Sequence, residues 1–306
     1  LEFSDKVRIY LCGVTVYDDA HIGHARTIIV FDVLHRFLKS QKISVEFIQN
    51  FTDIDDKIID KASQEKISAR QLAETYTKNY FTDFDGLNIK RATIYPKATE
   101  HIEDMQNLIA NLIDKKYAYV TKNGVYFSVS KFTEYGKLSK KNPDDLVSGA
   151  RVDIDEEKDN PIDFALWKFS ESELSWESPW GKGRPGWHIE CSAMSLKYLG
   201  ESFEIHGGGR DLIFPHHENE IAQSKCALDD KFVNYWLHNE HLLVDNQKMS
   251  KSSGNFYTIR DILDKGYKAE AIRYVLISSH YRQKLNFTLN RLDDAQKAIN
   301  KLRELL

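Results

Sequence analysis

The segment Val7–Leu38 constrains the fold of this chain more than any other stretch. Alternating apolar residues predict a buried strand over 7–16, and apolar residues at helical spacing predict a helix over 22–42. A short polar turn separates the two, and a second strand is predicted over 45–52. A strand, a helix and a strand with such short connections form the right-handed parallel unit that begins an α/β fold.

Two histidines stand where the predicted helix begins, in the run His21-Ile22-Gly23-His24. The first backbone N–H groups of a helix lack partners within the helix, and the helix dipole places positive charge there. Such a start can bind an anion such as phosphate. Gly23 gives a ligand room near the backbone, and the imidazoles of His21 and His24 can donate to phosphate oxygens. Taken alone, however, two histidines in a run of four residues are usually surface residues on the first turn of a helix.

Residues 95–165 show a different pattern. A helix is predicted over 97–116, followed by a hairpin whose strands, 117–120 and 125–129, flank an Asn-Gly turn. A polar stretch dense in Lys, Asp and Glu follows over 137–160. We interpret this block as an insertion between the two halves of the predicted sheet.

A glycine run follows a short predicted strand that ends at His206. Gly207, Gly208 and Gly209 would allow a nucleotide to approach the backbone, and Asp211 could bind ribose hydroxyls. The run alone is a weak signal, because flexible turns also use glycine.

Half of a metal site is predicted directly after this run. A helix is expected to start near Pro215, since proline suits the first helical position. His216 and Glu220 are then four residues apart and lie on one face, where an imidazole and a carboxylate can share a divalent metal. His217, three residues before Glu220, is the competing partner by geometry.

The remaining ligands must come from elsewhere in the chain. Among the three cysteines, Cys226 lies among apolar residues of a helix and is best interpreted as a buried, inert thiol. Cys12 and Cys191 lie in glycine-bearing segments expected to line the crevice at the strand ends. Thr52 either faces the same crevice or caps a turn. Two thiolates, an imidazole and a carboxylate would suit zinc, although no Cys-x-x-Cys pair supports the site.

The composition is that of an ordinary globular enzyme. Of its 306 residues, 42% are hydrophobic and 29% are charged. The net charge of −4 does not predict a nucleic-acid surface. No apolar run of membrane-spanning length and no signal-peptide pattern occurs, so we expect a cytoplasmic location and no membrane partner. Three widely spaced cysteines argue against a disulfide framework.

A lysine motif late in the chain makes the histidine motif specific. The run 248–252 reads K-M-S-K-S, and together with His21–His24 it resembles the KMSKS and HIGH signatures of class I aminoacyl-tRNA synthetases. Other segments resemble the cysteinyl-tRNA synthetase family, and this likeness extends from Tyr10 nearly to the end. They are C-G-V-T-V-Y-D within 12–24, N-F-T-D-I-D-D-K-I at 50–58, P-G-W-H-I-E-C-S-A-M at 185–194 and H-G-G-G-R-D-L-I-F-P-H-H-E-N-E at 206–220.

The resemblance implies an α/β fold with a Rossmann-type doubly wound parallel sheet. The first half of the catalytic domain would occupy 1–94, an inserted connective subdomain 95–165, and the second half, with a zinc site, 166–245. Residues 246–306 would hold the KMSKS loop and a helical stem-contact region. The family's anticodon-binding domain would follow, so we expect a catalytic fragment that retains adenylate formation and is impaired in tRNA charging.

The resemblance also implies an activity, that of a cysteine–tRNA ligase. L-Cysteine would react with ATP to give cysteinyl-adenylate, and the cysteinyl group would then pass to the 3′ end of tRNA(Cys). One Zn²⁺ per chain would select the thiol, Mg²⁺ would accompany ATP, and a monomer is expected. No separate editing domain is expected, because a zinc site with thiolate ligands prefers sulfur to a hydroxyl.

Roles for individual residues come from the same resemblance. It assigns zinc to Cys12, Cys191, His216 and Glu220, and so favours His216 over His217. It places the substrate cysteine beside Gly13, Thr52 and Trp187. The implied catalytic residues are His21, His24, Lys248 and Lys251, and the implied ATP-binding residues are His21, His24, Gly207, Gly208, Gly209, Asp211 and Lys251.

Two other functions compete with this interpretation. A cysteine:amino-sugar ligase would share the fold, the zinc site and the adenylate chemistry, and it would lack an anticodon domain. A non-catalytic RNA-binding paralogue is the second alternative. The intact residues His21, His24, Lys248 and Lys251 argue against it.

Overall fold

A four-stranded parallel sheet forms the centre of the protein. The computed structural model describes residues 5–142, 157–228 and 232–305. The sheet has the order β2-β1-β7-β8, from β1 (Lys6–Thr15), β2 (Ser44–Thr52), β7 (Phe203–Gly209) and β8 (Val233–Asn239). The chain passes outward from β1 to β2 on one side and from β7 to β8 on the other. The boundary between β1 and β7 is therefore the topological switch point, beyond which α/β proteins bind ligands.

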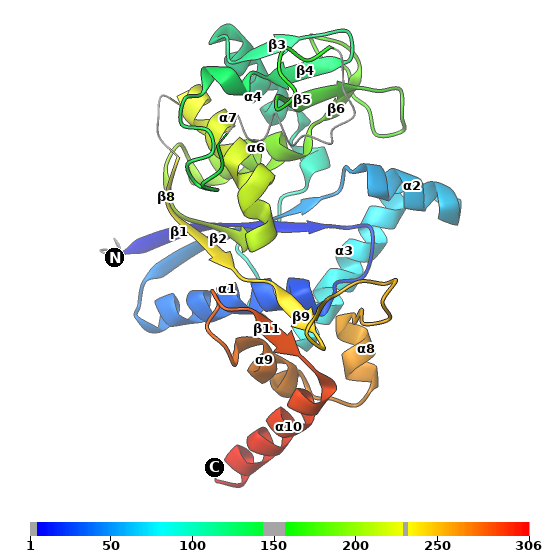
Figure 1. The fold of residues 1–306 in the computed structure, drawn as a ribbon, viewed down its shortest axis with the longest axis vertical. Helices are drawn as coiled ribbons and strands as arrows, with labels where there is room; N and C mark the ends of the chain where they lie inside the picture. The colour runs from blue at the N-terminus through cyan, green and yellow to red at the C-terminus, as the bar shows by residue number, and fades with distance from the viewer. Residues whose placement is uncertain (1–4, 143–156, 229–231, 306) are drawn as a thin grey trace.

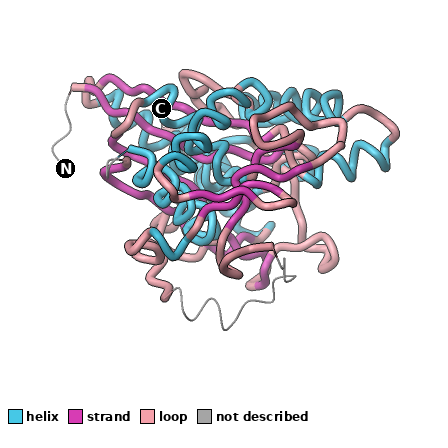
Figure 2. Tube along the Cα trace, turned by 90° about the horizontal axis from the view of Figure 1, so that it is seen from above, coloured by secondary structure: helices cyan, strands magenta, loops and turns pink. Residues whose placement is uncertain are grey.

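Helices cover both faces of this sheet, which confirms the predicted doubly wound, Rossmann-type architecture. Figure 1 shows α1 (Ile22–Ser40) and α9 (Ala269–Ile277) below the sheet and α6 (Trp187–Leu199) and α7 (Glu218–Leu228) above it. In the view from above, the strands run side by side with helices around them (Figure 2). No helix in the described ranges is both long enough and apolar enough to cross a membrane.

Three further helices follow β2 before the insertion sheet. They are α2 (Asp56–Glu65), α3 (Ala69–Gly86) and α4 (Ile102–Asp114), with a short helical turn at Ala98–Glu100. The helix predicted over 97–116 is thus divided at His101. Between α3 and α4 the chain runs alongside β2, where Ile94 and Lys97 pair in parallel with Ile48 and Phe51.

A second, antiparallel sheet stands at the top of Figure 1. It has the order β3-β4-β5-β6, from β3 (Ala118–Val120), β4 (Gly124–Phe127), β5 (Phe164–Phe169) and β6 (Gly183–Pro185). The predicted hairpin is confirmed, with Ala118 opposite Phe127. The boundary predicted at residue 165 falls inside β5, because β5 and β6 continue the antiparallel pairing. Residues 143–156 of the predicted polar stretch lie outside the described ranges.

The C-terminal part is attached to α1. It contains β9 (Leu242–Val244), β10 (Gln247–Lys248), α8 (Ile259–Asp264), β11 (Leu285–Phe287) and α10 (Leu289–Glu304). The buried guanidinium of Arg26 on α1 donates to the carbonyl oxygens of Glu240 (2.8 Å), His241 (2.7 Å) and Gln283 (2.5 Å). A buried guanidinium needs hydrogen-bond acceptors, and these three carbonyls couple Arg26 and α1 to this region.

His35 on α1 is a buried imidazole without a hydrogen-bond partner among the described residues. Both ring nitrogens are shielded from solvent, and the ring lies edge-on to Phe47 at 5.4 Å between centroids. Burial lowers the pKa of His35 to about 4, with smaller contributions from the nearby ammonium groups of Lys39 and Lys90. Since an unfolded histidine titrates near pH 6.5, acid should favour unfolding through this residue.

We expect His35→Leu to reduce the acid sensitivity of folding. As pH falls through 6.5 toward 4, the unfolded chain gains a proton at His35 that the folded chain does not, so stability is lost. Between pH 7.5 and pH 5, His35 should account for about 2 kcal/mol of lost unfolding free energy, and the variant should not suffer this loss. Urea unfolding at both pH values measures it. The exposed His280 provides a matched control, His280→Leu, and an equal effect there would contradict the assignment.

Candidate active site

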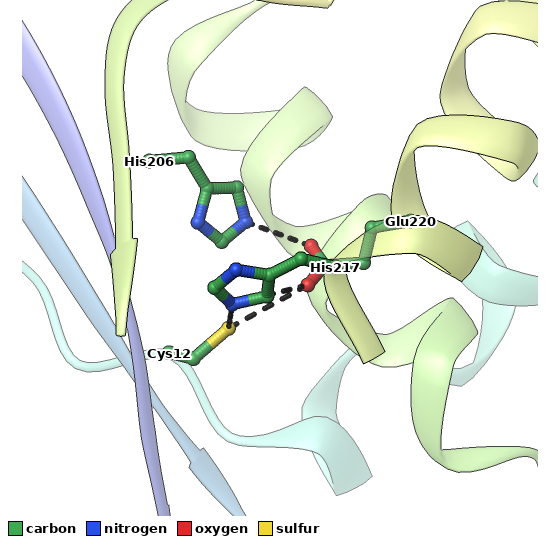
Figure 3. A group of neighbouring side chains, drawn as sticks. All are labelled: Cys12, His206, His217 and Glu220. Carbon is green, nitrogen blue, oxygen red and sulfur yellow. Dashed lines mark hydrogen bonds and ion pairs between the residues drawn. The ribbon is translucent and has the colours of Figure 1, made fainter. Parts of the chain in front are cut away.

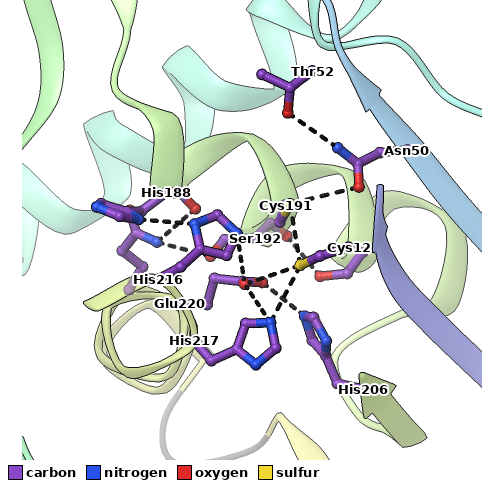
Figure 4. A network of polar contacts seen from close by, with 12 residues as sticks. Cys12, Asn50, Thr52, His188, Cys191, Ser192, His206, His216, His217 and Glu220 are labelled. Atoms are coloured by element: carbon purple, nitrogen blue, oxygen red, sulfur yellow. Dashed lines mark hydrogen bonds and ion pairs between the residues drawn. The ribbon is translucent and has the colours of Figure 1, made fainter. Parts of the chain in front are cut away.

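Residues far apart in sequence meet beyond the switch point of the central sheet (Figure 4). Cys12 comes from β1, Cys191 from α6, and Glu220 from α7, whereas His216 and His217 belong to the turn that precedes α7. All five side chains are buried. The crevice predicted from the strand order is therefore occupied by titratable and metal-binding groups.

The helical conformation expected near Pro215 is confirmed. Phe214 has extended dihedrals (φ −138°, ψ 130°), and the chain is helical again from Pro215, through one turn that leads into α7 at Glu218. The expected pair therefore forms. His216 Nε2 lies 3.2 Å from Glu220 Oε1.

Four side chains converge with the spacing of a tetrahedral metal site. Cys12 Sγ lies 3.7 Å from Cys191 Sγ and 3.6 Å from Glu220 Oε1, and the imidazole of His216 completes the group. Ligands of one tetrahedral zinc would be separated by about 3.8 Å between two sulfurs and about 3.3 Å between nitrogen and oxygen. The quartet Cys12, Cys191, His216 and Glu220 can therefore hold one divalent cation.

A second quartet overlaps the first and consists of Cys12, His206, His217 and Glu220 (Figure 3). Its geometry is less suited to a metal. His206 Nε2 lies 2.8 Å from Glu220 Oε2, which is a hydrogen-bond distance and is shorter than the separation of two ligands on one zinc. His206 thus orients the second oxygen of Glu220, and the first quartet keeps the other oxygen.

Burial shifts the pKa values of the imidazole and the two thiols of the quartet. It lowers the pKa of His216, so the imidazole is neutral and its lone pair is available to a metal. It raises the pKa values of Cys12 and Cys191, so both thiols keep their protons unless a cation stabilises the thiolates. A cation that binds the quartet must therefore displace the protons of both thiols.

Other histidines support the cluster, and sequence reasoning gave them no role. His188 Nδ1 lies 2.9 Å from His216 Nδ1, and His217 Nδ1 lies 2.8 Å from His238 Nε2. The second ring N–H of a metal-binding histidine usually donates a hydrogen bond to a neighbouring acceptor, so a partner for His216 is expected on general grounds. The sequence gives no sign of which residue it would be, because the partners belong to separate elements.

Asn50, at the end of β2, is a further residue that sequence reasoning missed. Its Oδ1 accepts a hydrogen bond from Gly13 N at 2.9 Å and lies 3.7 Å from Cys191 Sγ. Its Nδ2 donates to Thr52 Oγ1 at 3.5 Å. A side chain at Gly13 would overlap the backbone carbonyl of Asn50, so only glycine permits this approach of β1 to β2.

Trp187 lies between the buried quartet and solvent. Its ring centroid is 4.3 Å from that of His216, and its side chain is 39% exposed. The three expected cysteine-binding residues, Gly13, Thr52 and Trp187, therefore lie around the four expected metal ligands.

The start of α1 differs from the prediction in one respect. The imidazole Nδ1 of His21 accepts hydrogen bonds from the backbone N–H groups of Gly23 (3.1 Å) and His24 (3.2 Å), and Ile22 N donates to Tyr257 O. The prediction that free backbone N–H groups bind an anion is therefore wrong for this conformation, since His21 caps its own helix. Because Nδ1 is an acceptor, the proton lies on Nε2, which can donate to a ligand.

Burial keeps both histidines of this motif neutral. It lowers the pKa of His21 to about 4, although the carboxylates of Asp211 and Asp18 oppose the effect, and it lowers the pKa of His24 as well. The two rings stack with 3.6 Å between centroids. The motif thus offers neutral hydrogen-bond donors rather than positive charge.

The three glycines belong to the end of β7 rather than to a loop after it. A Cβ at Gly207 would overlap the ring of Phe31, so Gly207 makes room for α1. A Cβ at Gly208 would approach His217 Cε1 to 3.1 Å, which places Gly208 against the buried histidines. The packing of Phe31 therefore explains why glycine stands at position 207, without a nucleotide. Asp211, the expected ribose-binding residue, is exposed and lies near His21.

The lysine loop lies beside the histidine motif. Thr258 forms an antiparallel bridge with His21, and Ile259 N donates to Ala20 O at 3.1 Å. Lys251 forms an ion pair with Asp18, just before α1. Lys248 is exposed at the end of β10. The structure therefore brings the two sequence motifs to one edge of the crevice.

Comparison with known proteins supports a family assignment. Residues 2–297 match the family described as tRNA synthetases class I (C) catalytic domain. The cysteine–tRNA ligase of Thermodesulfovibrio yellowstonii is 57% identical over 302 residues, which cover 97% of this chain and 62% of that protein. The corresponding enzyme of Caldicellulosiruptor saccharolyticus is 54% identical, with 97% and 64% covered. The chain therefore spans less than two thirds of the length of these relatives.

Solved structures share the fold. The methionyl-tRNA synthetase of Mycobacterium tuberculosis in complex with methionyl-adenylate aligns with a TM-score of 0.76 at 15% identity, covering 94% of this chain and 67% of that one. At this identity the likeness concerns the fold alone. Together with the match across residues 2–297, it agrees with the switch-point architecture. The chain belongs to the family of class I (C) tRNA synthetase catalytic domains.

Proposed function

We propose that the protein is a cysteine–tRNA ligase, which activates L-cysteine with ATP and transfers it to the 3′ end of tRNA(Cys). The observation that carries the proposal is the buried quartet of Cys12, Cys191, His216 and Glu220 at the switch point. Relatives that match 97% of this chain are cysteine–tRNA ligases. A site with two thiols suits a substrate whose distinguishing group is also a thiol.

The proposed metal is zinc, one ion per chain, held by that quartet. The donor set supports zinc, because thiolate and imidazole ligands in tetrahedral spacing are typical of it. When bound, zinc would bind the sulfur of L-cysteine and would disfavour serine, whose hydroxyl is a weaker ligand for such a site. His188 and His206 would hold His216 and Glu220 in position through their hydrogen bonds.

Residues around the quartet would orient the amino acid. Trp187 would cover the side chain of the substrate and exclude water, since its ring packs on His216 at the solvent boundary. Asn50 holds the backbone of Gly13 and the hydroxyl of Thr52, so it would fix the two strand ends between which the substrate sits. A fixed orientation of the substrate carboxylate lowers the entropic part of the barrier to attack on ATP.

The two motifs at the crevice edge would bind ATP. His21 Nε2–H would donate to a phosphate oxygen, with His24 stacked behind it, and Asp211 would accept from ribose hydroxyls near Gly208 and Gly209. Lys251, with Lys248, would stabilise the negative charge that develops on the leaving pyrophosphate. Mg²⁺ is expected to accompany ATP. Transfer to tRNA, the monomeric state and the cytoplasmic location are part of the same proposal.

We expect the chain to catalyse ATP–pyrophosphate exchange that depends on L-cysteine. Lys251→Ala should lower the exchange rate by about a hundredfold, because a charge-stabilising donor in the transition state is lost. Lys284→Ala, at an exposed lysine away from both motifs, is the control and should leave the rate unchanged. Exchange supported equally by L-serine, or an undiminished rate in Lys251→Ala, would contradict the proposal.

Zinc analysis tests the ligand set independently of activity. The purified chain should contain about one zinc, and Cys191→Ser should reduce this content strongly because a thiolate ligand is removed. Cys226→Ser is the matched control, since Cys226 is buried outside both quartets, and its zinc content should be unchanged. After dialysis against zinc-free buffer, His216→Ala should contain little zinc and His217→Ala should keep its ion. The reverse pattern would assign the metal to the second quartet.

A further inference from the structure

We propose that Asp18 is a positioning residue that holds the ammonium group of Lys251 at the edge of the nucleotide site until ATP displaces it. Asp18 lies in the turn between β1 and α1, close to His21. The proposal rests on the proposed function, in which Lys251 must reach the phosphates of ATP. It assigns to Asp18 a resting-state contact that controls how readily Lys251 becomes available.

The carboxylate of Asp18 is shared by two ammonium groups. Lys251 Nζ donates to Oδ2, and Lys61 Nζ donates to Oδ1 at 3.2 Å. The backbone N–H of Asp19 also donates to Oδ1, at 2.9 Å. Partial burial alone would raise the pKa of Asp18, but these three hydrogen bonds together lower it, which keeps the carboxylate charged.

The two lysines are held to different degrees. Lys61, on α2, also donates to the hydroxyl of Tyr76 at 2.8 Å and lies 4.5 Å from the centre of that ring, with 25% of its side chain exposed. Lys251 is 65% exposed and comes from a loop, where its Nζ lies 5.2 Å from the ring centre of Phe256. Lys61 is thus the fixed partner of Asp18, and Lys251 is the partner that can leave.

The loop has a fixed base from which Lys251 can move. Tyr257 O accepts a hydrogen bond from Ile22 N, Ile259 N donates to Ala20 O, and Phe256 packs edge-on against His21 at 5.4 Å. We expect the ammonium group of Lys251 to leave Asp18 when the loop carries it to a phosphate group of ATP. When it moves to ATP, Asp18 retains Lys61, so no unpaired carboxylate remains. Only molecules in which Lys251 is free bind ATP with full affinity. The apparent affinity for ATP is therefore the full affinity multiplied by the fraction of molecules in which Lys251 is free.

Substitutions of the two partners should change ATP affinity in opposite directions. Asp18→Asn removes the charge that holds Lys251, so the dissociation constant for ATP should fall about two- to fivefold, as expected for an exposed ion pair. Lys61→Met leaves Lys251 as the only cation on Asp18, so the constant should rise by a similar factor. Titration calorimetry with Mg²⁺-ATP, without amino acid, measures both. If the dissociation constant for ATP falls or stays the same in Lys61→Met, the proposal is wrong.

Two controls separate this contact from a general effect of charge. Asp19→Asn removes the same charge from the neighbouring residue, which contacts Asn79 and Arg260 instead of Lys251, and should leave the ATP constant unchanged. In a Lys251→Ala background, Asp18→Asn and Lys61→Met should have no effect on ATP binding. If the Asp18→Asn effect persists there, it arises from weaker repulsion of ATP and the proposal is wrong.

The binding assay also distinguishes this proposal from the proposed function. If the opposite shifts occur but no amino acid supports pyrophosphate exchange, the contact is real and the proposed ligase activity is wrong. If cysteine-dependent exchange occurs and Asp18→Asn binds ATP like the unaltered chain, only the role of Asp18 is wrong. A chain that does not bind ATP overturns both.

Discussion

The parallel pairing of β1 with β7 is the constraint on which the rest of the structure depends. The register places Tyr10 opposite His206 and Leu11 opposite Gly207. Arg8 reinforces it at the other end of the strands, where its guanidinium and backbone N–H both donate to the carboxylate of Glu204. Because a shift by one residue would turn every side chain to the opposite face, this register decides that Tyr10 lies beside His206. Cys12 follows the last of these pairs, where the pairing of β1 with β2 is interrupted between Leu11 and Val14.

Elements defined by local patterns could be predicted from the sequence. The β1–α1–β2 unit and the hairpin of β3 and β4 appear close to their expected ranges, since apolar periodicity and turn residues act over short distances. The pairing of β5 and β6 with the insertion sheet, and the short strand β11, depend on partners remote in sequence. No local pattern indicates such partners, so the predicted boundary at residue 165 was placed inside a strand.

In the candidate site, too, local spacing could be interpreted from the sequence and contacts between remote segments could not. Residue types and spacing identified His216 and Glu220 as partners, and the structure places Cys12 and Cys191 beside them. Spacing could not decide between His216 and His217, because residues three and four positions before Glu220 lie on the same face of a helix and both approach its carboxylate. The hydrogen bonds that separate the two quartets come from His188 and His206, on different elements. Such outer contacts can be recognised only when the tertiary structure is known.

The cap on α1 has a consequence for how this edge of the crevice can vary. His21 uses Nδ1 to cap the start of the helix, which leaves Nε2–H as its remaining donor, so in the proposed function a single imidazole serves both the helix cap and ligand recognition. An Asn or Asp there could end the helix through its short side chain but would not extend a ring N–H beyond it. A substitution of His21 therefore changes the helix cap and the outer ring donor together.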